Sequence, residues 1–464
     1  MTLLASSALQ KSNLHDVSGP STNAEYVARQ EARESNARTY ARRLRIAVTR
    51  AKGVTLTDAD GKTYFDCLAA AGTLALGHNH PAIVSALKTA LDQDMLFQSL
   101  DIATPVKDAF TDALLGTLPP AFAARARIQF CSPAGTDAIE AAIKLVKTAK
   151  QKSGLFAFSG AYHGMSQSVM GMMGNLGPRQ NLAGHTQTAQ FLPYPHSYRC
   201  PFGVGGDQTE ILSTSYVRSL LEDPESGVLP AAMVLEIVQG EGGVIPAPDQ
   251  WTRAMRELTS THAVPLVVDE VQTGWGRTGA LYAFGHSGIT PDVLVLSKAI
   301  GGGLPMAVII YDKSLDLWQP GAHAGTFRGN TLAMVAGMAT LQVIQEESLA
   351  QHAALMGQRL LSHLRAAQAD LPILGDVRGR GLMVGVEIVD TQDQPDALGH
   401  YPADAIAARQ IRQACQDRGL ILEMGGRHSA VARFLPPLII TADQIDTVAS
   451  IFVDACRSVM KAAV

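Results

Sequence analysis

The stretch AVPLVVDEVQTGWGRTG (residues 263–279), followed by DVLVLSKAIGGG (292–303), decides the fold class. Each contains a short apolar run that ends in a charged side chain, Asp269 in the first and Lys298 in the second, before a glycine-rich turn. Near-continuous apolar runs of this length predict strands of a parallel sheet that is covered on both faces. Because ligands of such sheets bind beyond the carboxyl ends of the strands, the two charged side chains are predicted to share one site.

Short apolar runs and helical patterns alternate on both sides of this stretch. A strong helix is predicted at 136–149, and strands are predicted at 126–132, 154–160, 231–238, 263–271 and 292–298. This alternation predicts an α/β fold with a large domain on a mostly parallel sheet. Beyond residue 345, helices predicted at 349–367, 404–419 and from Ala442 onward surround a strand at 381–388, which indicates a smaller α+β domain.

The N-terminal quarter contains a predicted hairpin. VTLTDADGKTYFDCL (54–68) has two β-rich runs around Asp60-Gly61, a strong turn signal, and we expect it to pair with the smaller domain. The Arg-rich segment from Tyr26 to Arg45 is interpreted as a helix or an extended arm. The predicted organisation is a disordered segment (1–25), an arm and hairpin packing with the small domain (26–76), a large cofactor-binding domain (77–345) and a small C-terminal domain (346–464).

Composition excludes several classes of protein. The 464 residues are 47% hydrophobic and 17% charged, which excludes bulk disorder, and a net charge of −4 gives no basic surface for nucleic acid or anionic membranes. No apolar run approaches the roughly 18 residues of a membrane helix, and the N-terminus lacks the basic region of a secretory signal. The five cysteines are scattered without a CxxC pair, so we expect reduced thiols in the cytoplasm and no metal site.

Three stretches were weighed as phosphate-binding motifs. GKT at 61–63 is not a P-loop, because Leu56 stands where a glycine is required. GWGRTG (274–279) matches the dinucleotide pattern, but no long helical pattern follows it. SPAGTDAIEAAIKLVK (132–147) places Gly135 and Thr136 between a strand and a long helix, where backbone N–H groups bind a phosphate. The alternative is an ordinary N-cap by Thr136.

Lys298 and Asp269 suit one particular chemistry. A lysine that burial keeps neutral can form a Schiff base with an aldehyde. Pyridoxal phosphate offers that aldehyde and needs an anion beside its pyridine nitrogen, a task that fits Asp269. A buried salt bridge between neighbouring strand ends explains these two residues equally well.

The chain resembles the class III aminotransferases, pyridoxal-phosphate enzymes of fold type I, from about residue 40 to residue 460. The most specific block is DEVQTGWGRTG with the following SKAIGGGLP. The other matching motifs are GHNHP (77–81), AGTDAIEAAIKLV, GAYHG (160–164), EIVQGEGG (236–243), GTFRGN (325–330), VRGRGLMVGVEI and RFLPPL (433–438).

The resemblance implies roles for the residues around the cofactor, pyridoxal 5'-phosphate. Lys298 would form the Schiff base and later move the proton, and Asp269 would pair with the pyridine nitrogen. Gln272 would hydrogen-bond the phenolic oxygen, and Tyr162 would stack on the ring. The phosphate would be held by Gly135, by Thr136 and by Thr326 of the other subunit, so the active enzyme would be a homodimer or a dimer of dimers.

The resemblance also implies the substrate contacts. Arg433 would bind a carboxylate of glutamate or 2-oxoglutarate, for which a guanidinium is suited. Glu241 would neutralise Arg433 when the bound amine lacks that carboxylate, and Glu236 would lie near cofactor and substrate. Arg328 precedes Gly329-Asn330 and is a hypothetical contact for the α-carboxylate of a diamino acid.

Departures from the family pattern bear on the substrate. Ala134 stands where the phosphate loop usually has serine, so one hydroxyl donor is lost. Ornithine-type relatives carry an aromatic residue and an arginine for the substrate's α-carboxylate; the matching positions here are Ala71 and Met165, which disfavours ornithine.

Within the family the closer resemblance is to the L-2,4-diaminobutyrate:2-oxoglutarate aminotransferases. It is carried by stretches such as DCLAAAGTLALGHNHP (66–81), FQSLDIATPVKDAF (97–110) and FLPYPHSYRCPFG (191–203). It implies ping-pong exchange of the 4-amino group of diaminobutyrate with glutamate, for siderophore, diaminopropane or peptide pathways. The alternatives are another ω-aminotransferase (4-aminobutyrate, taurine or ectoine-route type), a mutase or racemase, and a catalytically silent binding protein.

Overall fold

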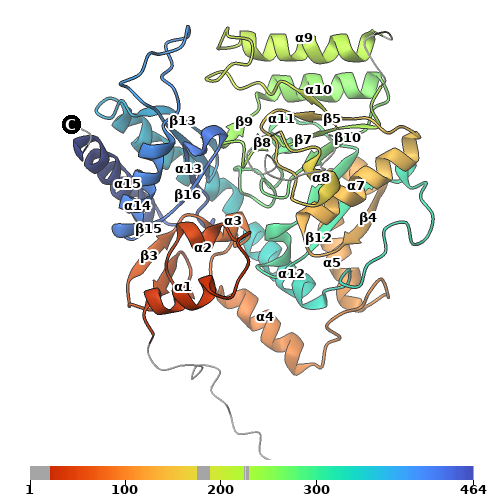
Figure 1. The fold of residues 1–464 in the computed structure, drawn as a ribbon. Helices are drawn as coiled ribbons and strands as arrows, with labels where there is room; N and C mark the ends of the chain where they lie inside the picture. The colour runs from red at the N-terminus through yellow and green to blue at the C-terminus, as the bar shows by residue number, and fades with distance from the viewer. Residues whose placement is uncertain (1–20, 175–188, 224, 226–228, 463–464) are drawn as a thin grey trace, which may run out of the picture.

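The computed structural model describes residues 21–174, 189–223, 225 and 229–462 (Figure 1). Within these residues, one seven-stranded sheet has the order β4-β12-β11-β10-β7-β5-β6. Only the pairings of β12 with β11 and β4 are antiparallel, so the predicted mostly parallel sheet is confirmed. The strands are β4 (Ala126–Cys131), β5 (Leu155–Phe158), β6 (Gln190–Leu192), β7 (Ala232–Leu235), β10 (Leu266–Asp269), β11 (Val293–Leu296) and β12 (Ala307–Asp312).

Helices cover this sheet on both faces, and alternating strand residues enter two cores. In β10, Val267 belongs to one apolar cluster while Leu266 and Val268 belong to the other. All three are at most 1% exposed, which explains the uninterrupted apolar run. Strand β12 is not among the strands predicted above; its run AVIIYD fills the place between β4 and β11.

The helices of this large lobe follow the predicted alternation. The strong helix predicted at 136–149 is α7 (Gly135–Lys150), and Pro81 occupies the first turn of α4. The other elements of the lobe are α4 (Pro81–Asp92), α5 (Pro105–Leu115), α6 (Pro120–Ala123), α8 (Gln167–Met170), α9 (Gln208–Glu222), α10 (Asp249–Thr261), α11 (Phe284–Ser287), α12 (Thr331–Glu346), the short strands β8 (Val238–Gln239) and β9 (Ile245–Pro246), and the 3₁₀ turns η2 (Lys298–Gly301) and η3 (Lys313–Leu315).

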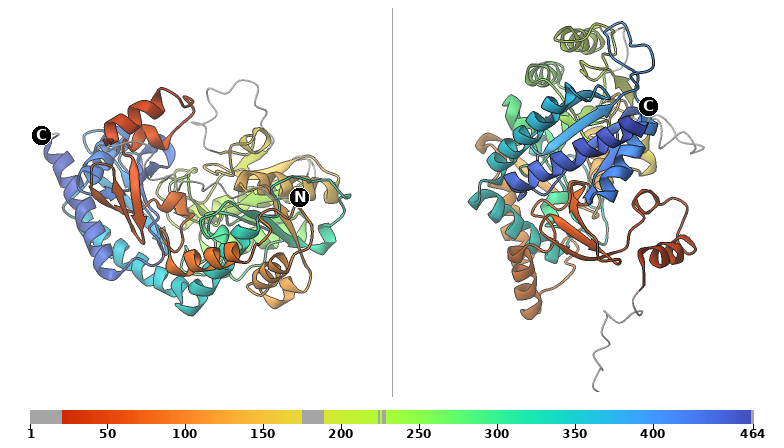
Figure 2. Two further views of the ribbon diagram at one scale, coloured as in Figure 1. Left: turned by 90° about the horizontal axis from the view of Figure 1, so that it is seen from below. Right: turned by 90° about the vertical axis from the view of Figure 1, so that its left-hand side faces the viewer.

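A small lobe combines the two ends of the chain (Figure 2, left-hand view). The predicted hairpin is present as β2 and β3, and β3 pairs in parallel with the C-terminal strand β15. A second sheet has the order β13-β14-β17-β16. The elements are β1 (Val48–Lys52), β2 (Thr55–Asp58), β3 (Thr63–Asp66), α3 (Ala69–Gly72), α13 (Leu349–Gln368), β13 (Leu374–Arg380), β14 (Met383–Ile388), α14 (Ala405–Asp417), β15 (Leu420–Ile421), β16 (Glu423–Gly425), η4 (Arg427–Ser429), β17 (Val431–Phe434) and α15 (Ala442–Ala462).

The N-terminal segment is ordered from a point earlier than the sequence predicted. Disorder was expected over 1–25, and residues 1–20 lie outside the described residues. Helix α1 (Asn23–Glu31) already starts at residue 23 and has a capping box formed by Thr22 and Glu25. The Asn23 side chain also donates to Asp58 and Asp60 of the hairpin, at 2.8 and 2.9 Å. A short α2 (Tyr40–Arg43) follows.

Candidate active site

Three neighbouring parallel strands bring three charged residues to one edge of the large sheet. The register pairs Val268 with Leu235 and Asp269 with Val295, so β7, β10 and β11 end at about the same level. Glu236 follows β7, Asp269 ends β10, and Lys298 comes two residues after β11. Because parallel strands expose their carboxyl ends together, this edge is where a ligand of the sheet is expected.

A cavity of about 300 Å³ lies at this edge. Within the described chain, Lys298 has no hydrogen-bond or ion-pair partner, and its φ of +50° is a strained, left-handed conformation. Burial lowers the pKa of the Lys298 ammonium, against the charges of Glu241 and Asp269 that raise it. The lining residues are Ala134, Gly135, Thr136, Tyr162, His163, Gly164, Met165, Glu236, Glu241, Asp269, Val271, Gln272 and Lys298.

Asp269 is held by a histidine that the sequence did not predict as a site residue. His163 Nδ1 lies 2.8 Å from Asp269 Oδ2, and Val271 N donates to Oδ1 at 3.0 Å. Burial alone would lower the pKa of His163, but the hydrogen bond and charge of Asp269 raise it overall. The pair therefore keeps a negative carboxylate fixed against a buried partner. The signal was available: His163 lies in GAYHG beside Tyr162.

The amino end of α7 faces the same cavity. Its N-cap is Ala134, which gives no side-chain cap, so the N-cap role considered for Thr136 is not the observed one. The Thr136 hydroxyl instead donates to Ser166 Oγ at 2.9 Å. A side chain at Gly135 would place its Cβ 3.0 Å from Val271, so only glycine fits without a shift. Among the described residues, the N–H groups of Gly135 and Thr136 have no hydrogen-bond partner, so they are left for an anion.

Tyr162, Gln272 and Glu236 complete this part of the cavity. Gln272 Nε2 donates to Ala71 O at 3.1 Å, while its buried Oε1 has no partner among the described residues. Glu236 accepts from Tyr162 N and Gly240 N, both at 3.0 Å. Burial raises the pKa of Glu236 to about 7, with His163 opposing and Asp269 adding to the rise. The Glu236 side chain thus holds two loops of the site together by accepting from their backbone N–H groups.

The opposite end of the site is built by both lobes. Glu241 and Arg433 meet in a bidentate pair, Nη1–Oε1 at 2.8 Å and Nη2–Oε2 at 3.0 Å. Arg433 belongs to β17 of the small lobe and is 1% exposed, and Glu423 lies 3.6 Å from its Nη2. Burial would raise the pKa of Glu241, but the Arg433 charge lowers it overall. Glu241 and Arg433, which the resemblance predicts to be partners, therefore form an ion pair in the structure.

Thr326 and Arg328 do not line the Lys298 cavity of their own chain. Thr326 is exposed on the loop that precedes α12. Arg328 is 6% exposed; it donates to Phe130 O at 3.1 Å and Ala324 O at 2.8 Å, and lies 3.7 Å from Asp137. Within one chain this buried guanidinium is occupied by backbone carbonyls, so the substrate contact predicted for it is not made there.

The arrangement agrees with what sequence comparison finds. The family described as aminotransferase class-III matches residues 36–456 of the chain. The chain belongs to this family. Class-III aminotransferases use pyridoxal 5'-phosphate, and the present chain has the residues that such a family member needs: a lysine and an aspartate at adjacent strand ends and an uncapped helix beside them.

Two relatives and one solved structure align with nearly the whole chain. A protein of Rhizobium meliloti named diaminobutyrate–2-oxoglutarate aminotransferase is 55% identical over 437 residues, 94% of this chain and 93% of its own. One of Haemophilus influenzae with the same name is 47% identical, over 89% and 91% of the two chains. A PLP-bound amine transaminase structure from an uncultivated Pseudomonas species is 26% identical, with a TM-score of 0.80 over 92% of this chain and 97% of that one. Fold type I is thereby confirmed.

The chemistry of the donors fits the cofactor of this aminotransferase family. An unpartnered lysine suits an aldehyde, a fixed carboxylate suits a pyridinium nitrogen, and free N–H groups at a helix start suit a phosphate. Lys298, Asp269 and the amino end of α7 would hold these three parts. Loss of the serine hydroxyl at Ala134 leaves this set of backbone donors in place.

Proposed function

We propose that this aminotransferase exchanges the 4-amino group of L-2,4-diaminobutyrate with 2-oxoglutarate, giving L-aspartate 4-semialdehyde and glutamate, and also catalyses the reverse reaction. The printed names of the relatives at 55% and 47% identity support this substrate pair. The observation that carries the proposal is the bidentate Glu241–Arg433 pair at the edge of the Lys298 cavity. Such a pair suits an enzyme that must accept two chemically different amino donors in turn.

The two donors differ at the carbon that carries the reacting amine. In glutamate this carbon also bears a carboxylate, whereas C4 of diaminobutyrate bears only hydrogens and carbon. Arg433 can bind the carboxylate as a bidentate partner. With diaminobutyrate bound, an Arg433 without Glu241 would keep only Glu423, 3.6 Å away, as a counter-ion, and breaking a buried ion pair costs several kcal/mol. Glu241 supplies the counter-ion and leaves when glutamate binds.

When bound, pyridoxal phosphate supplies an electron sink that stabilises negative charge on the carbon losing its proton. Lys298 would hold the cofactor's aldehyde carbon, and its amine would take and return a proton at the substrate's amino-bearing carbon. A lowered pKa favours the neutral amine that this task needs. Asp269 would serve as the anion beside the pyridine nitrogen, and His163 orients Asp269. Tyr162 would stack on the ring, and Gln272 would hydrogen-bond the phenolic oxygen.

Ornithine is a poor fit as the amino donor. Met165 lines the cavity and Ala71 only offers its carbonyl to Gln272, so neither position provides a cation for an α-carboxylate. Diaminobutyrate is one carbon shorter than ornithine, and its α-carboxylate would lie at a different place in the site.

We further propose that two chains complete each other's active sites, with Thr326 reaching the phosphate in the partner. The segment around Ser99 and the segment around Gly329 lie side by side and support this proposal. Ser99 N donates to Gly329 O at 2.9 Å, and Gln98 and Asn330 form an antiparallel β-bridge. Together they expose large apolar side chains, at Leu96, Phe97, Leu100, Ile102, Leu317 and Phe327. Clustered apolar exposure of this kind marks an interaction surface.

A cytoplasmic location and a role in supplying diaminobutyrate to siderophore or related pathways are also part of the proposal. All five cysteines are free thiols, which suits a reducing compartment. Across the described ranges, none of the helices has the length and apolar character needed to span a membrane.

A half-reaction screen tests the proposal. The cofactor-loaded protein is mixed with glutamate, diaminobutyrate, 4-aminobutyrate, taurine and ornithine one at a time, and loss of the visible absorbance band is followed. Fast reaction with glutamate and diaminobutyrate, and slow reaction with the others, is expected. A preference for 4-aminobutyrate or taurine would contradict the substrate assignment, and no spectral change with any amine would favour a silent binding protein.

A further inference from the structure

The turn that carries Glu241 is held in an unfavourable conformation. It runs from Gly240 to Val244, and the N–H groups of Gly243 and Val244 both donate to Gly240 O, at 3.1 and 3.2 Å. Val244 is fully buried and has a φ of +54°, a left-handed conformation that a β-branched residue rarely adopts. Such a residue costs about 1–3 kcal/mol and persists only where its surroundings hold it.

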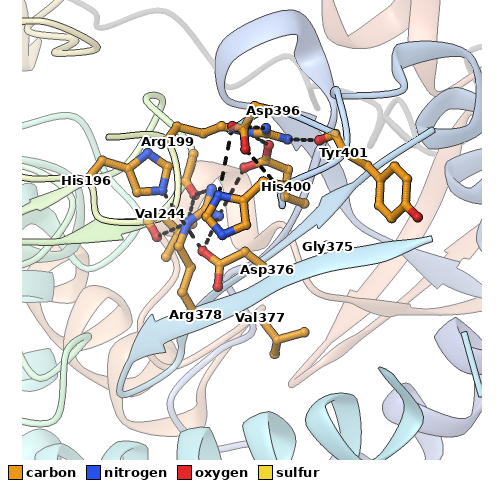
Figure 3. Close-up of polar contacts among 12 residues, drawn as sticks. His196, Arg199, Val244, Gly375, Asp376, Val377, Arg378, Asp396, His400 and Tyr401 are labelled. Atoms are coloured by element: carbon orange, nitrogen blue, oxygen red, sulfur yellow. Dashed lines mark hydrogen bonds and ion pairs between the residues drawn. The ribbon is translucent and has the colours of Figure 1, made fainter. Parts of the chain in front are cut away.

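Gly426 N donates to Glu241 O at 3.0 Å, and Arg378 holds the second half of this turn (Figure 3). Its Nε donates to the carbonyls of Gly243 and Val244, at 3.0 and 3.1 Å, and its Nη2 donates to Gly243 O at 2.7 Å. The guanidinium comes from β13 of the small lobe and is buried. Three donor contacts on two adjacent carbonyls fix the direction of the peptide planes that follow Glu241.

Arg378 is itself fixed from the other side. Its Nη1 donates to Asp376 Oδ2 at 2.8 Å and to Glu387 Oε2 at 3.2 Å. Glu387 in turn accepts from Arg199 Nε at 2.8 Å. A planar guanidinium held by two carboxylates has little freedom to rotate, so the carbonyls of the turn meet a rigid donor.

The turn separates two cavities. Glu241 lines the Lys298 cavity, while the next residue, Gly242, lines a second cavity of about 330 Å³ that Arg378 and Glu387 also border. Across the described residues the two cavities share no lining residue. The turn therefore has free volume behind it, and packing alone does not keep Glu241 directed at Arg433.

We propose that Arg378 is a positioning residue for the exchange of partners at Arg433. It keeps Val244 in its left-handed conformation and so presents the Glu241 carboxylate to Arg433 when the bound amine has no carboxylate at its reacting carbon. This inference rests on the proposed function, because it deepens the role given there to Glu241. Lysine cannot replace this arginine, because one ammonium cannot contact both carbonyls and both carboxylates in a plane.

The experiment compares the rate constants of the diaminobutyrate and glutamate half-reactions in Arg378→Lys. The diaminobutyrate constant is expected to fall about tenfold more than the glutamate constant, a difference of about 1.4 kcal/mol. The matched control is Arg380→Lys, which lies on the same strand but pairs with Asp249 at 2.8 Å. In Arg380→Lys the ratio of the two rate constants is expected to equal that of the wild type. An equal fall of both constants in Arg378→Lys would overturn the proposal and leave a purely structural role.

A double-mutant cycle shows whether Arg378 acts through Glu241. In a Glu241→Ala background, Arg378→Lys should no longer change the ratio of the two constants, since there is no carboxylate left to position. A full tenfold shift in that background would overturn the proposal. Asp376→Asn, which keeps Arg378 but weakens its support, provides a milder variant should Arg378→Lys fold poorly. The ratio of the two rate constants in Asp376→Asn should shift in the same direction, and an unchanged ratio would count against Arg378 as the positioning residue.

Failure of the proposed function would be recognised separately. A wild-type protein that does not react with diaminobutyrate contradicts the substrate, but the same cycle can then be run with 4-aminobutyrate, whose reacting carbon also lacks a carboxylate. The positioning role of Arg378 stands or falls on the ratio measured with that amine.

Discussion

The two ends of the active site are built by opposite means. At the Lys298 end, charged residues sit at the ends of adjacent strands of one sheet, and Asp269 is fixed by a buried histidine at 2.8 Å. At the Arg433 end, the charges come from different lobes, and Glu241 sits on a glycine-rich turn. Under the proposed function, the difference teaches that the chemistry is placed on rigid backbone, whereas the choice between substrates is placed on a group that can change partner.

Carboxylates in the two regions also differ in their affinity for protons. Burial raises the pKa of Glu270, next to Asp269, to about 7, as it does for Glu236. Glu241 is held in the opposite direction, because the Arg433 charge outweighs burial and lowers its pKa. A nearby counter-ion, rather than burial itself, therefore decides which acids stay charged at neutral pH.

The largest effect is expected at the rigid end. Lys298→Ala should lower turnover by about 10⁴-fold or more, because the variant loses both the covalent anchor and the proton-transfer group. Fold and thermal midpoint should persist, as should the dimer. Steady-state assays with glutamate and aspartate 4-semialdehyde measure the loss, and Lys313→Ala, an exposed lysine, is the control. Turnover near the wild-type value would refute the assignment of Lys298.

Asp269→Asn should have the next largest effect. Removing the negative charge while keeping the shape should slow both half-reactions by about 10³-fold, because the cofactor would lose its fixed counter-ion. Both should slow alike, since this end serves either substrate. Single-turnover absorbance measurements separate the two, with Asp249→Asn as the control. A selective loss of one half-reaction would break the division between the two ends.

Glu241→Ala should instead change the ratio of the half-reactions. Loss of the carboxylate leaves Arg433 without its counter-ion only when diaminobutyrate is bound, so that half-reaction should fall about tenfold more than the glutamate half-reaction. The same absorbance assay measures it, with the exposed Glu222→Ala as the control. Equal damage to both would argue against a changing partner.

The last prediction concerns stability rather than activity. The neutral form of Glu270 is favoured in the folded chain, so between about pH 5 and 7 the unfolded chain loses its proton first and the folded state loses stability as pH rises. Glu270→Gln should remove this contribution, so that the free energy of unfolding falls by about 2 kcal/mol less between pH 5 and pH 8. Urea unfolding at several pH values tests it, with exposed Glu257→Gln as the control. An unchanged pH slope would show that Glu270 is charged in the folded protein.

Much of the fold and of the cofactor end could be predicted from local sequence. Apolar runs and turn residues gave five of the parallel strands, helix α7 and the N-terminal hairpin, and two of the runs ended in Asp269 and Lys298. Strand β12 was missed, as were the helical residues before position 26, whose order depends on Asn23 reaching Asp58 and Asp60 across the chain. His163 was missed because its partner lies 106 residues away.

By itself the sequence determined the order of strands and helices, the identity of the family and the residues that can carry its chemistry, because these depend on local pattern. The family resemblance already paired Glu241 with Arg433, but only the tertiary structure decided what the other buried guanidinium groups contact. Arg328 turns to backbone carbonyls, and Arg378 reaches the turn of Val244. These pairings join residues far apart in the chain, and their energies depend on distance and burial, which exist only once the chain has folded.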